Sequence, residues 1–187
     1  MTDDLTTLHT DLAARADAAG LLDVAYRIVD SPIGALLLAA TPTGLVRVAF
    51  EREGFDDVLD ALAAKISPRI LASSERLAIA ATQLDDYFAG RRRHFDLPID
   101  HTLSSGFRLD VQRHLPDIDY GHTMSYAQVA ELVGNPKAVR AVGTACATNP
   151  HPVVVPCHRV LRADGGLGGY LGGAEAKRAL LTLEGAA

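Results

Sequence analysis

The chain has 187 residues, 48% of them hydrophobic, and 18 basic against 23 acidic side chains give it a formal net charge of −5. This composition is typical of a globular protein and excludes collagen-like, low-complexity and disulfide-rich chains. No apolar run is long enough to span a membrane, and no secretory signal is recognisable, so we expect a cytoplasmic protein with no membrane partner. The two cysteines, Cys146 and Cys157, form neither a disulfide framework nor a zinc pattern.

The charge is divided unevenly along the chain. Residues 1–100 carry ten basic and sixteen acidic side chains, whereas residues 101–187 carry eight and seven. Phosphate contacts dominate the affinity of proteins for nucleic acids, so an acidic chain is not an obvious binder of DNA. If it does bind DNA, we expect few phosphate contacts and a modest dependence on salt.

The first hundred residues predict a helix followed by a small mixed domain. Leucines at helical spacing predict a helical extension over residues 1–22 that packs on the surface of the core. Turn signals rich in proline and glycine separate three short β runs, which favours an antiparallel meander, and helices follow. The expected elements are strands at 24–29, 35–40 and 45–50, helices at 56–65 and 73–88 with Ser73 as N-cap, and a strand returning at 93–99. We place the domain boundary near residue 100.

The remaining residues predict a mainly helical domain. Phe107, Val111 and Leu115 recur every four residues, which gives one apolar helix face. Ser125 and Gln128 form a capping box at the start of a second helix. Gly134 ends that helix, and Asn135 with Pro136 is expected to open the next one, so the pair reads as a helix-turn-helix. Alone this motif is weakly specific, because many helix pairs bind no nucleic acid.

One stretch of the second half carries the chemistry. Residues 153–155 are three valines, which predict a buried strand, and Pro156 ends it where a short helix can begin. Cys157 at that helix start would have a lowered pKa and a reactive thiolate. His158 follows directly, and because neighbouring helical residues do not face each other, the two would communicate through a bridging water or a shared third group. The alternative is that Cys157 is only a small buried apolar residue.

Four ordered motifs make the sequence resemble the O6-alkylguanine-DNA alkyltransferases, also called methylated-DNA–protein-cysteine methyltransferases. The family signature Pro-Cys-His-Arg-Val stands at residues 156–160, with Asn-Pro at 149–150 before it. A Gly-Tyr-x-Gly-Gly motif follows at 169–173 and a Leu-x-x-Glu-Gly motif at 181–185. The resemblance is dense from about residue 107 to 185, and it is thinner but visible at 87–90 and 95–98.

The resemblance implies an α+β fold with a ribonuclease-H-like first domain over residues 23–100 and a DNA-binding, active-site domain over 101–187. It implies a protein that is a monomer in the absence of DNA, binds double-stranded alkylated DNA and flips out O6-methylguanine, and by extension O4-methylthymine. The alkyl group would pass irreversibly to Cys157, in one turnover and without a cofactor. The zinc ligands of some members are absent from the first half, so we expect no metal.

Residue by residue, the resemblance implies three groups of site residues. The catalytic group comprises Cys157, His158 and Glu184 as a relay, Asn149 at the turn before the cysteine, and Tyr126 as proton donor to the leaving base. The DNA-binding group lies on the second helix of the pair. Arg140 would fill the gap left by the flipped nucleotide. Small residues would allow the helix to approach the DNA closely, namely Ala138, Ala141 and Gly143. The pocket group comprises Tyr170, Val160, Leu171 and Gly172.

Two residues depart from the family pattern, and two other function classes are compatible with parts of the sequence. Gln112 stands where the family often has tryptophan, and Leu171 stands where a smaller residue is common. We expect Leu171 to narrow the tolerance for large alkyl groups. A non-catalytic binder of alkylated DNA would lack the cysteine that Cys157 supplies. A cysteine hydrolase would need an oxyanion hole and a histidine that faces the cysteine from elsewhere in the chain. Arg140 could also be an ordinary solvated cation.

Overall fold

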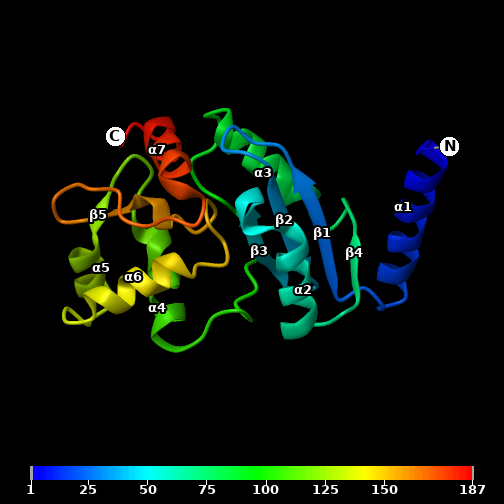
Figure 1. Cartoon of the computed structure of the whole chain (residues 1–187), viewed down its shortest axis with the longest axis horizontal. Coiled ribbons are helices and arrows are strands. Elements are labelled where there is room, and N and C mark those ends of the chain that lie inside the picture. The colour runs from blue at the N-terminus through cyan, green and yellow to red at the C-terminus, as the bar shows by residue number, and fades with distance from the viewer. Residues whose placement is uncertain (1, 187) are drawn as a thin grey trace. The chain divides into compact units, whose positions relative to one another are not determined.

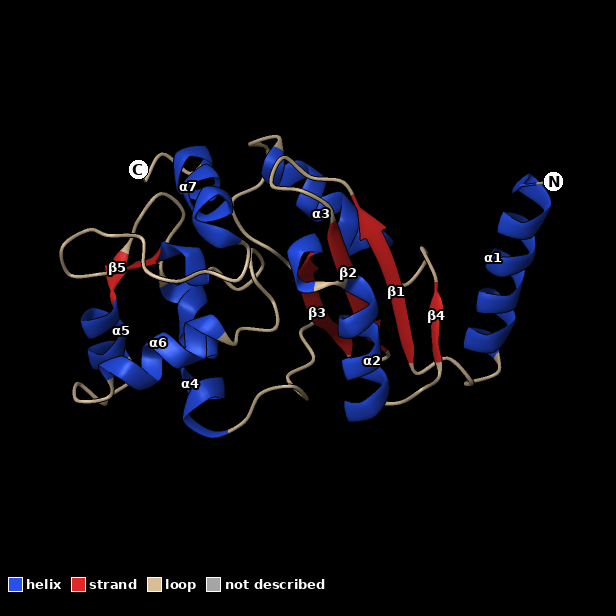
Figure 2. Cartoon of the chain, in the orientation of Figure 1, coloured by secondary structure: helices blue, strands red, loops and turns tan. Residues whose placement is uncertain are grey.

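The computed structural model describes the backbone of residues 2–186 and the side chains of residues 7–186. The chain divides into two compact units, the first formed by Met1–Asp86 and Asp96–Asp100 and the second by Tyr87–Phe95 and His101–Ala187. Figures 1 and 2 show a β-sheet in the first unit and mainly helices in the second, which confirms the predicted α+β class. Residues 87–95, assigned from sequence to the first domain, belong to the second unit because the buried ring of Tyr87 packs against Tyr120.

The first unit is organised around a four-stranded sheet with the order β3-β2-β1-β4. Strand β2 pairs antiparallel with both β1 and β3, so the predicted meander is confirmed. Every residue of β2 is buried, as expected of a central strand. The parallel pairing of β4 with β1 was not predicted, because β4 has only three residues. The strands are β1 (Val24–Val29), β2 (Leu36–Thr41), β3 (Gly44–Phe50) and β4 (Ile70–Ala72).

The helices of the first unit are α1 (Thr2–Ala18), α2 (Phe55–Lys65) and α3 (Ala78–Phe88), with a 3-10 turn η1 (Glu51–Glu53). Helix α1 lies beside β4 at the edge of the sheet (Figure 1). Its predicted apolar face is only partly covered, since Ala13 is buried whereas Leu8 and Leu12 are 61% and 53% exposed. Leu5, also predicted for that face, lies outside the described side chains.

Two predicted details of the first unit are wrong. Ser73 does not cap α3, because its backbone N–H donates to the Tyr26 carbonyl and so continues the sheet. Residues 93–99 do not form a strand and reach the sheet only through an isolated bridge from Ile99 to Leu45. Pro98 has no N–H to donate, which limits any longer ladder there.

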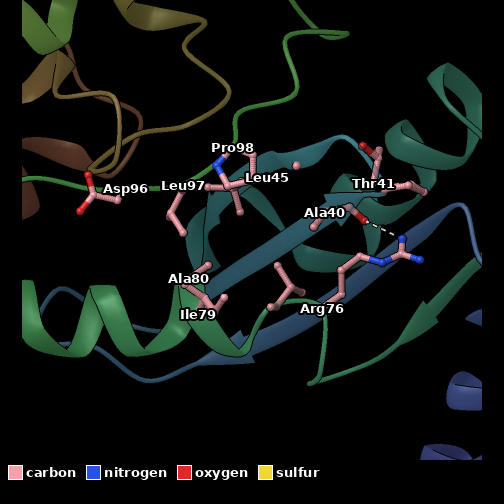
Figure 3. A pocket seen from close by; sticks show the side chains of 12 residues that line it. Ala40, Thr41, Leu45, Arg76, Ile79, Ala80, Asp96, Leu97 and Pro98 are labelled. Atoms are coloured by element: carbon pink, nitrogen blue, oxygen red, sulfur yellow. Dashed lines mark hydrogen bonds between the residues drawn. The ribbon is translucent and has the colours of Figure 1, made fainter.

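A pocket of about 200 Å³ lies within the first unit, between β2, the start of α3 and the extended segment at Asp96–Pro98 (Figure 3). Its walls are mainly apolar, and Arg76 is the basic side chain that borders it. The Arg76 guanidinium donates to the carbonyls of Leu22 and Ala40 and pairs with Asp17 of α1. Arg76 therefore fastens the end of α1 to the sheet.

The second unit packs its helices around one apolar core. Val111 and Leu115, both predicted from the spacing along the first helix, are fully buried in this core together with Val129, Val142 and Val160. The elements are α4 (Gly106–His114), η2 (Leu115–Asp117), β5 (Met124–Ser125), α5 (Tyr126–Leu132), α6 (Val139–Ala147), η3 (Cys157–Arg159), β6 (Val160–Leu161) and α7 (Gly173–Leu183). No helix within residues 2–186 combines the length and apolar character that a membrane crossing requires.

The helix pair α5–α6 forms with one correction at its turn. The capping box is confirmed, since Ser125 Oγ accepts from the Gln128 N–H and the Gln128 side chain accepts from the Ser125 N–H. Asn135 does not cap α6. Its carbonyl instead accepts from the Ala138 N–H in a separate turn, and α6 begins at Val139 with Ala138 as N-cap.

The three valines at 153–155 are buried but do not form the predicted strand. They lie in a turn closed by a hydrogen bond of 2.7 Å from the Val155 N–H to the His151 carbonyl. Prolines at 150, 152 and 156 flank the valines, and a residue without an N–H cannot support a ladder. Val153 has a φ of +73°, which is a strained backbone for a β-branched residue immediately before the site described below.

Gly44 provides a test of the first unit's packing. Its φ is +152°, and a Cβ at this position would lie 2.2 Å from the Pro98 carbonyl oxygen. We expect Gly44→Ala to lower the free energy of unfolding by about 3 kcal/mol or more, because β3 or the Pro98 segment must move. Gly34→Ala is the matched control, with a φ of +95° and no atom within 4 Å of the added Cβ. It is expected to cost only about 1 kcal/mol. Equal losses for the two variants in chemical denaturation would contradict the packing argument.

Candidate active site

Cys157 lies at the first position of η3, directly after the turn of residues 153–155 and Pro156, and it belongs to the core of the second unit. Its side chain is almost fully buried, with 3% exposure. The Asn149 amide nitrogen donates to the Cys157 sulfur at 3.2 Å and to the Val155 carbonyl at 2.8 Å. The Asn149 oxygen accepts from the His151 N–H at 3.0 Å. Asn149 therefore both closes the turn and contacts the sulfur.

The sequence-based expectation of a lowered thiol pKa is wrong for this structure. Burial raises the pKa of Cys157 to about 11, while the hydrogen bond from Asn149 and the charge of Lys177 act in the opposite direction. The 3-10 turn has only three residues, so its dipole is too short to offset burial. Cys157 is therefore a protonated thiol at neutral pH and needs a proton acceptor before it can react.

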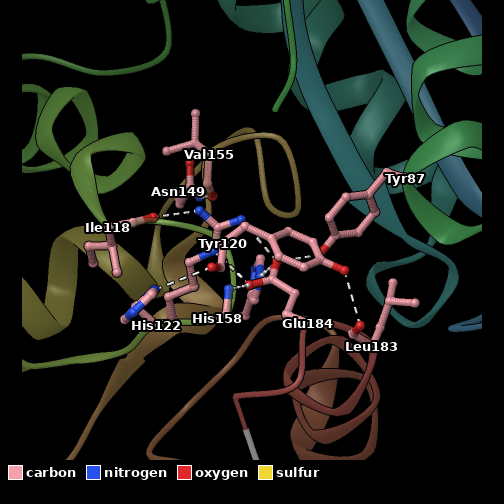
Figure 4. A network of polar contacts seen from close by, with 11 residues as sticks. Tyr87, Ile118, Tyr120, His122, Asn149, Val155, His158, Leu183 and Glu184 are labelled. Atoms are coloured by element: carbon pink, nitrogen blue, oxygen red, sulfur yellow. Dashed lines mark hydrogen bonds and ion pairs between the residues drawn. The ribbon is translucent and has the colours of Figure 1, made fainter. Parts of the chain in front are cut away.

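His158 and Glu184 form the second part of the site (Figure 4). The Glu184 side chain at the end of α7 places Oε1 at 2.9 Å from His158 Nε2, and both residues are buried. Burial lowers the pKa of His158, and Glu184 acts in the opposite direction, so His158 is neutral near pH 7. His158 Nδ1 is buried and has no hydrogen-bond partner among the described residues. That nitrogen is therefore available to accept a proton, as a relay from Cys157 requires.

Glu184 is held by more donors than the sequence suggested. Arg159 donates to both carboxylate oxygens, at 2.8 and 2.9 Å, and its third nitrogen donates to the Ile118 carbonyl. Tyr87 donates to Oε1 at 2.6 Å, and the Gly121 N–H lies 3.3 Å from Oε2. Burial alone would raise the pKa of Glu184, but the hydrogen bonds from His158, Arg159 and Tyr87 hold it at about 2. The carboxylate is therefore ionised throughout the neutral range.

Tyr126 and the glycine-rich loop of residues 165–172 form a wall beside the Cys157 thiol. The parallel pairing of β5 with β6 places Tyr126, the first residue of α5, next to the strand that follows η3. Burial raises the pKa of Tyr126, so its hydroxyl remains a proton donor. A Cβ on Gly168 would lie 2.7 Å from that hydroxyl, which shows how closely the loop approaches the ring.

The predicted pocket residues gather around the same core. Val160 is fully buried within the cluster that contains Cys157, and Tyr170 packs against it. The Tyr170 ring lies edge-on to the His158 ring, with centroids 6.5 Å apart. Leu171 and Gly172 are partly buried where the loop leads into α7. The structure therefore brings the predicted catalytic and pocket residues into one region of the second unit.

The residues predicted for DNA binding lie on α6 and at its start. Arg140 and Ala141 are exposed, whereas Ala138 and Gly143 are partly buried. The opposite face of α6 buries Val142, Ala145 and Cys146 in the core. Burial raises the pKa of Cys146 well above its ordinary value, so this second thiol is a core residue.

Three contributing residues were not identified from the sequence. Arg159 belongs to the quoted motif but had no assigned role, and Tyr87 is too far away in sequence for its contact with Glu184 to be inferred. Lys177 is fully buried in α7, where its ammonium donates to the Val160 carbonyl at 2.6 Å and to the Leu167 carbonyl. A signal for Lys177 did exist, since it shares the apolar side of its helix with Leu180 and Leu181.

Gln112, the departure from the family's tryptophan, is also buried. Its amide nitrogen donates to the Ala145 carbonyl of α6 at 3.0 Å, while its amide oxygen has no hydrogen-bond partner among the described residues. Gln112 thus joins α4 to α6 by a hydrogen bond rather than by ring packing. Among the described side chains of residues 7–186, no three His, Cys, Asp or Glu groups gather as metal ligands would.

Comparisons with known proteins agree with this geometry over both units. Residues 24–101 match the family model for the 6-O-methylguanine DNA methyltransferase ribonuclease-like domain, and residues 106–186 match the model for the DNA binding domain of the same family. The methylated-DNA–protein-cysteine methyltransferase of Mycolicibacterium paratuberculosis is 42% identical over 86% of this chain and 92% of its own length. The constitutive enzyme of that name from Bacillus subtilis is 37% identical over 85% and 94%.

Solved structures extend the likeness to the fold. The crystal structure of Mycobacterium tuberculosis OGT in complex with DNA superposes with a TM-score of 0.75 and 38% identity, covering 86% of this chain and 92% of that one. Two family models that together span most of the chain, and relatives this similar over nearly their whole length, lead to one conclusion. The chain belongs to the 6-O-methylguanine DNA methyltransferase family.

Proposed function

We propose that this protein repairs DNA by transferring the alkyl group of O6-alkylguanine to the sulfur of Cys157. Alkyl transfer to a cysteine is the activity for which its relatives are named. The observation that carries the assignment to Cys157 is its environment: a buried sulfur with an amide donor from Asn149, followed in the chain by the His158–Glu184 pair. Cys146 is buried in the same core, but the residue that follows it is Ala147 and not a histidine, so we assign it no part in the transfer.

The first step is activation of the thiol. With a pKa near 11, the Cys157 thiol must lose its proton to a nearby base. His158 is neutral and presents Nδ1 for this proton, through a bridging water, while Nε2 faces Glu184. The ionised carboxylate stabilises the imidazolium that results, and Asn149 stabilises the thiolate by donating a hydrogen bond.

The second step is displacement at the alkyl carbon. A bond forms between sulfur and carbon as the bond between carbon and O6 of the base breaks, and the electron pair leaves with the guanine oxygen. A proton donor at that oxygen lowers the barrier, and the hydroxyl of Tyr126 is the candidate. Tyr170, Val160, Leu171 and Gly172 form the walls that hold the base.

The substrate must reach a buried sulfur, so the base has to leave the duplex. Helix α6 would approach double-stranded DNA with Arg140 exposed for insertion into the stack and with small residues, Ala138, Ala141 and Gly143, beside it. The DNA complex of the M. tuberculosis relative supports DNA as the partner. O4-methylthymine is proposed as a minor substrate.

The product accounts for the expected stoichiometry. A thioether has no good leaving group, and no residue of the site could hydrolyse it, so each molecule repairs one lesion. We propose that the protein is a monomer in the absence of DNA and that it resides in the cytoplasm, where reducing conditions keep the Cys157 thiol free.

The central test is to incubate the protein with duplex DNA containing O6-methylguanine and to determine the mass of the Cys157 peptide. We expect one added methyl group per protein molecule, retained in Cys146→Ala and absent in Cys157→Ala. Restoration of guanine in the DNA should match the methylated protein mole for mole. Tight binding of the damaged duplex with no methyl on any cysteine would instead identify a lesion-binding protein. Release of methanol with repeated turnover would indicate a hydrolase.

Asn149 tests the activation step. Asn149→Asp keeps an oxygen for the His151 N–H but removes the donor to the sulfur and to the Val155 carbonyl, and it adds a negative charge beside the sulfur. The pKa of Cys157 is expected to rise further, and the transfer rate at neutral pH to fall by about tenfold or more. Thr148→Ala is the control, because the Thr148 hydroxyl bonds only the Thr144 carbonyl. A Thr148→Ala rate as low as that of Asn149→Asp would show that loss of any side-chain hydrogen bond at the end of α6, and not the contacts of Asn149, lowers the rate.

Gly168 tests the pocket wall. Gly168→Ala would press a methyl group against the Tyr126 hydroxyl from a backbone with φ of +66°, so we expect the loop or the ring to shift into the base site. The rate of transfer should fall about tenfold or more. Gly165→Ala is the matched control, since its φ of +81° is also positive and a Cβ there meets no atom within 4 Å. Similar single-turnover rates for both variants would argue against a base site at this wall.

A further inference from the structure

Tyr87 contacts the active-site carboxylate from a position far away in the sequence. Its side chain is fully buried, and its hydroxyl donates to Glu184 Oε1 at 2.6 Å. That oxygen is the one that faces His158 Nε2 at 2.9 Å (Figure 4). Burial raises the pKa of Tyr87 far above its ordinary value, so the hydroxyl stays protonated and remains a donor.

We propose that Tyr87 is a positioning residue for alkyl transfer: its hydroxyl fixes Glu184 and draws off part of the carboxylate charge, so that His158 stays a neutral proton acceptor. This inference rests on the proposed function, in which His158 takes the proton of Cys157. Tyr87 does not touch the reacting atoms and acts through Glu184.

The charged and polar groups around the His158–Glu184 pair come from several elements. Glu184 faces the Tyr87 hydroxyl from the end of α3, the Gly121 N–H from the loop before β5, and Arg159 from η3. His158 faces the Glu184 carboxylate and the edge of the Tyr170 ring. The positive charges of Arg159 and Lys177 also act on its imidazole. Burial and the two cations disfavour a charged imidazole, and the carboxylate favours it, so a change in the charge on Oε1 shifts the balance.

A hydrogen bond from a neutral donor stabilises the carboxylate and weakens its attraction for a neighbouring proton. The Tyr87 hydroxyl and the Arg159 guanidinium both bond Oε1, so His158 faces only part of the charge. Removal of the hydroxyl would leave more charge facing His158, which favours the imidazolium and raises the pKa of His158. Because transfer needs the neutral imidazole, the loss of rate on the acid side would begin at higher pH.

The aromatic surroundings make Tyr87→Phe a conservative change. The Tyr87 ring packs against Phe88, Phe95 and Tyr120, with centroids 5.4, 5.2 and 6.2 Å away, and phenylalanine keeps these contacts. Glu184 also keeps the donors of His158, Arg159 and Gly121, so the carboxylate is not left unpaired. We therefore expect the variant to fold.

Tyr120→Phe is the matched control. It removes a hydroxyl from the same aromatic cluster, but that hydroxyl donates to the Leu183 carbonyl at 3.0 Å and not to the carboxylate. A purely structural role for the cluster predicts the same behaviour for both variants. A role through Glu184 predicts a change for Tyr87→Phe alone.

The experiment measures single-turnover transfer from O6-methylguanine duplex between about pH 5 and 8, for wild type, Tyr87→Phe and Tyr120→Phe. In parallel, the His158 imidazole is titrated by NMR in histidine-labelled protein without DNA, with the His158→Gln variant identifying its signal among the seven histidines. Thermal unfolding of each variant shows whether stability has changed by similar amounts.

For Tyr87→Phe we expect a rate close to wild type near pH 8 and roughly threefold lower on the acid limb, with the His158 titration displaced to higher pH. Tyr120→Phe should follow wild type in both measurements. Unshifted profiles for Tyr87→Phe, or an equal loss at every pH in both variants, would overturn the inference. If wild-type protein transfers no methyl group, the proposed function fails, and the NMR titration still decides whether Tyr87 controls His158.

Discussion

The second unit depends on one buried negative charge. An ionised carboxylate without water is tolerated only when donors surround it, and Glu184 receives them from four places: the end of α3, the loop at Gly121, and His158 and Arg159 of η3. Loss of the charged partner of such a group, here Arg159, typically costs about 3–5 kcal/mol, because the remaining charge is left uncompensated. Folding of this unit therefore requires the geometry that chemistry also needs. The bidentate Arg159 contact fixes the carboxylate plane, and that plane orients His158.

The same constraint explains why the turn before Cys157 can carry strain. Val153 has a left-handed backbone that a valine rarely adopts, and it lies between the α6 core residues and the η3 network, both fully packed. Asn149 satisfies the polar groups of the turn on one side and the sulfur on the other. The position of the sulfur is therefore set by packing on both sides of the turn, and the Asn149 amide orients a donor toward it in the resting protein.

Local sequence patterns predicted the regular elements well, because each was specified by its own residues. The meander followed from proline and glycine turns, and the start of α5 followed from Ser125 and Gln128. The failures arose where distant contacts decide the outcome. The valines at 153–155 have strand propensity, but flanking prolines and the Asn149 contacts hold them in a turn. The thiol pKa was misjudged because burial, a tertiary property, outweighs a short dipole. Tyr87 and Lys177 reach the site through tertiary contacts that local patterns do not encode. The pairing of His158 with Glu184 is also a tertiary contact, and only the family resemblance allowed it to be predicted.

Burial of Cys157 appears at first to oppose its function, since it stabilises the thiol over the reactive thiolate. The opposition is resolved by following the charge through the reaction. The thiolate is charged and poorly solvated in the core, whereas the thioether product is neutral and apolar, so the same burial that makes the thiolate costly favours the product. An enzyme that must turn over could not hold its product in this way. A protein that reacts once gains driving force from it, provided that a neutral base and a hydrogen-bond donor make the thiolate accessible for the moment of transfer. His158, kept neutral chiefly by its burial, and the amide of Asn149 meet these two requirements.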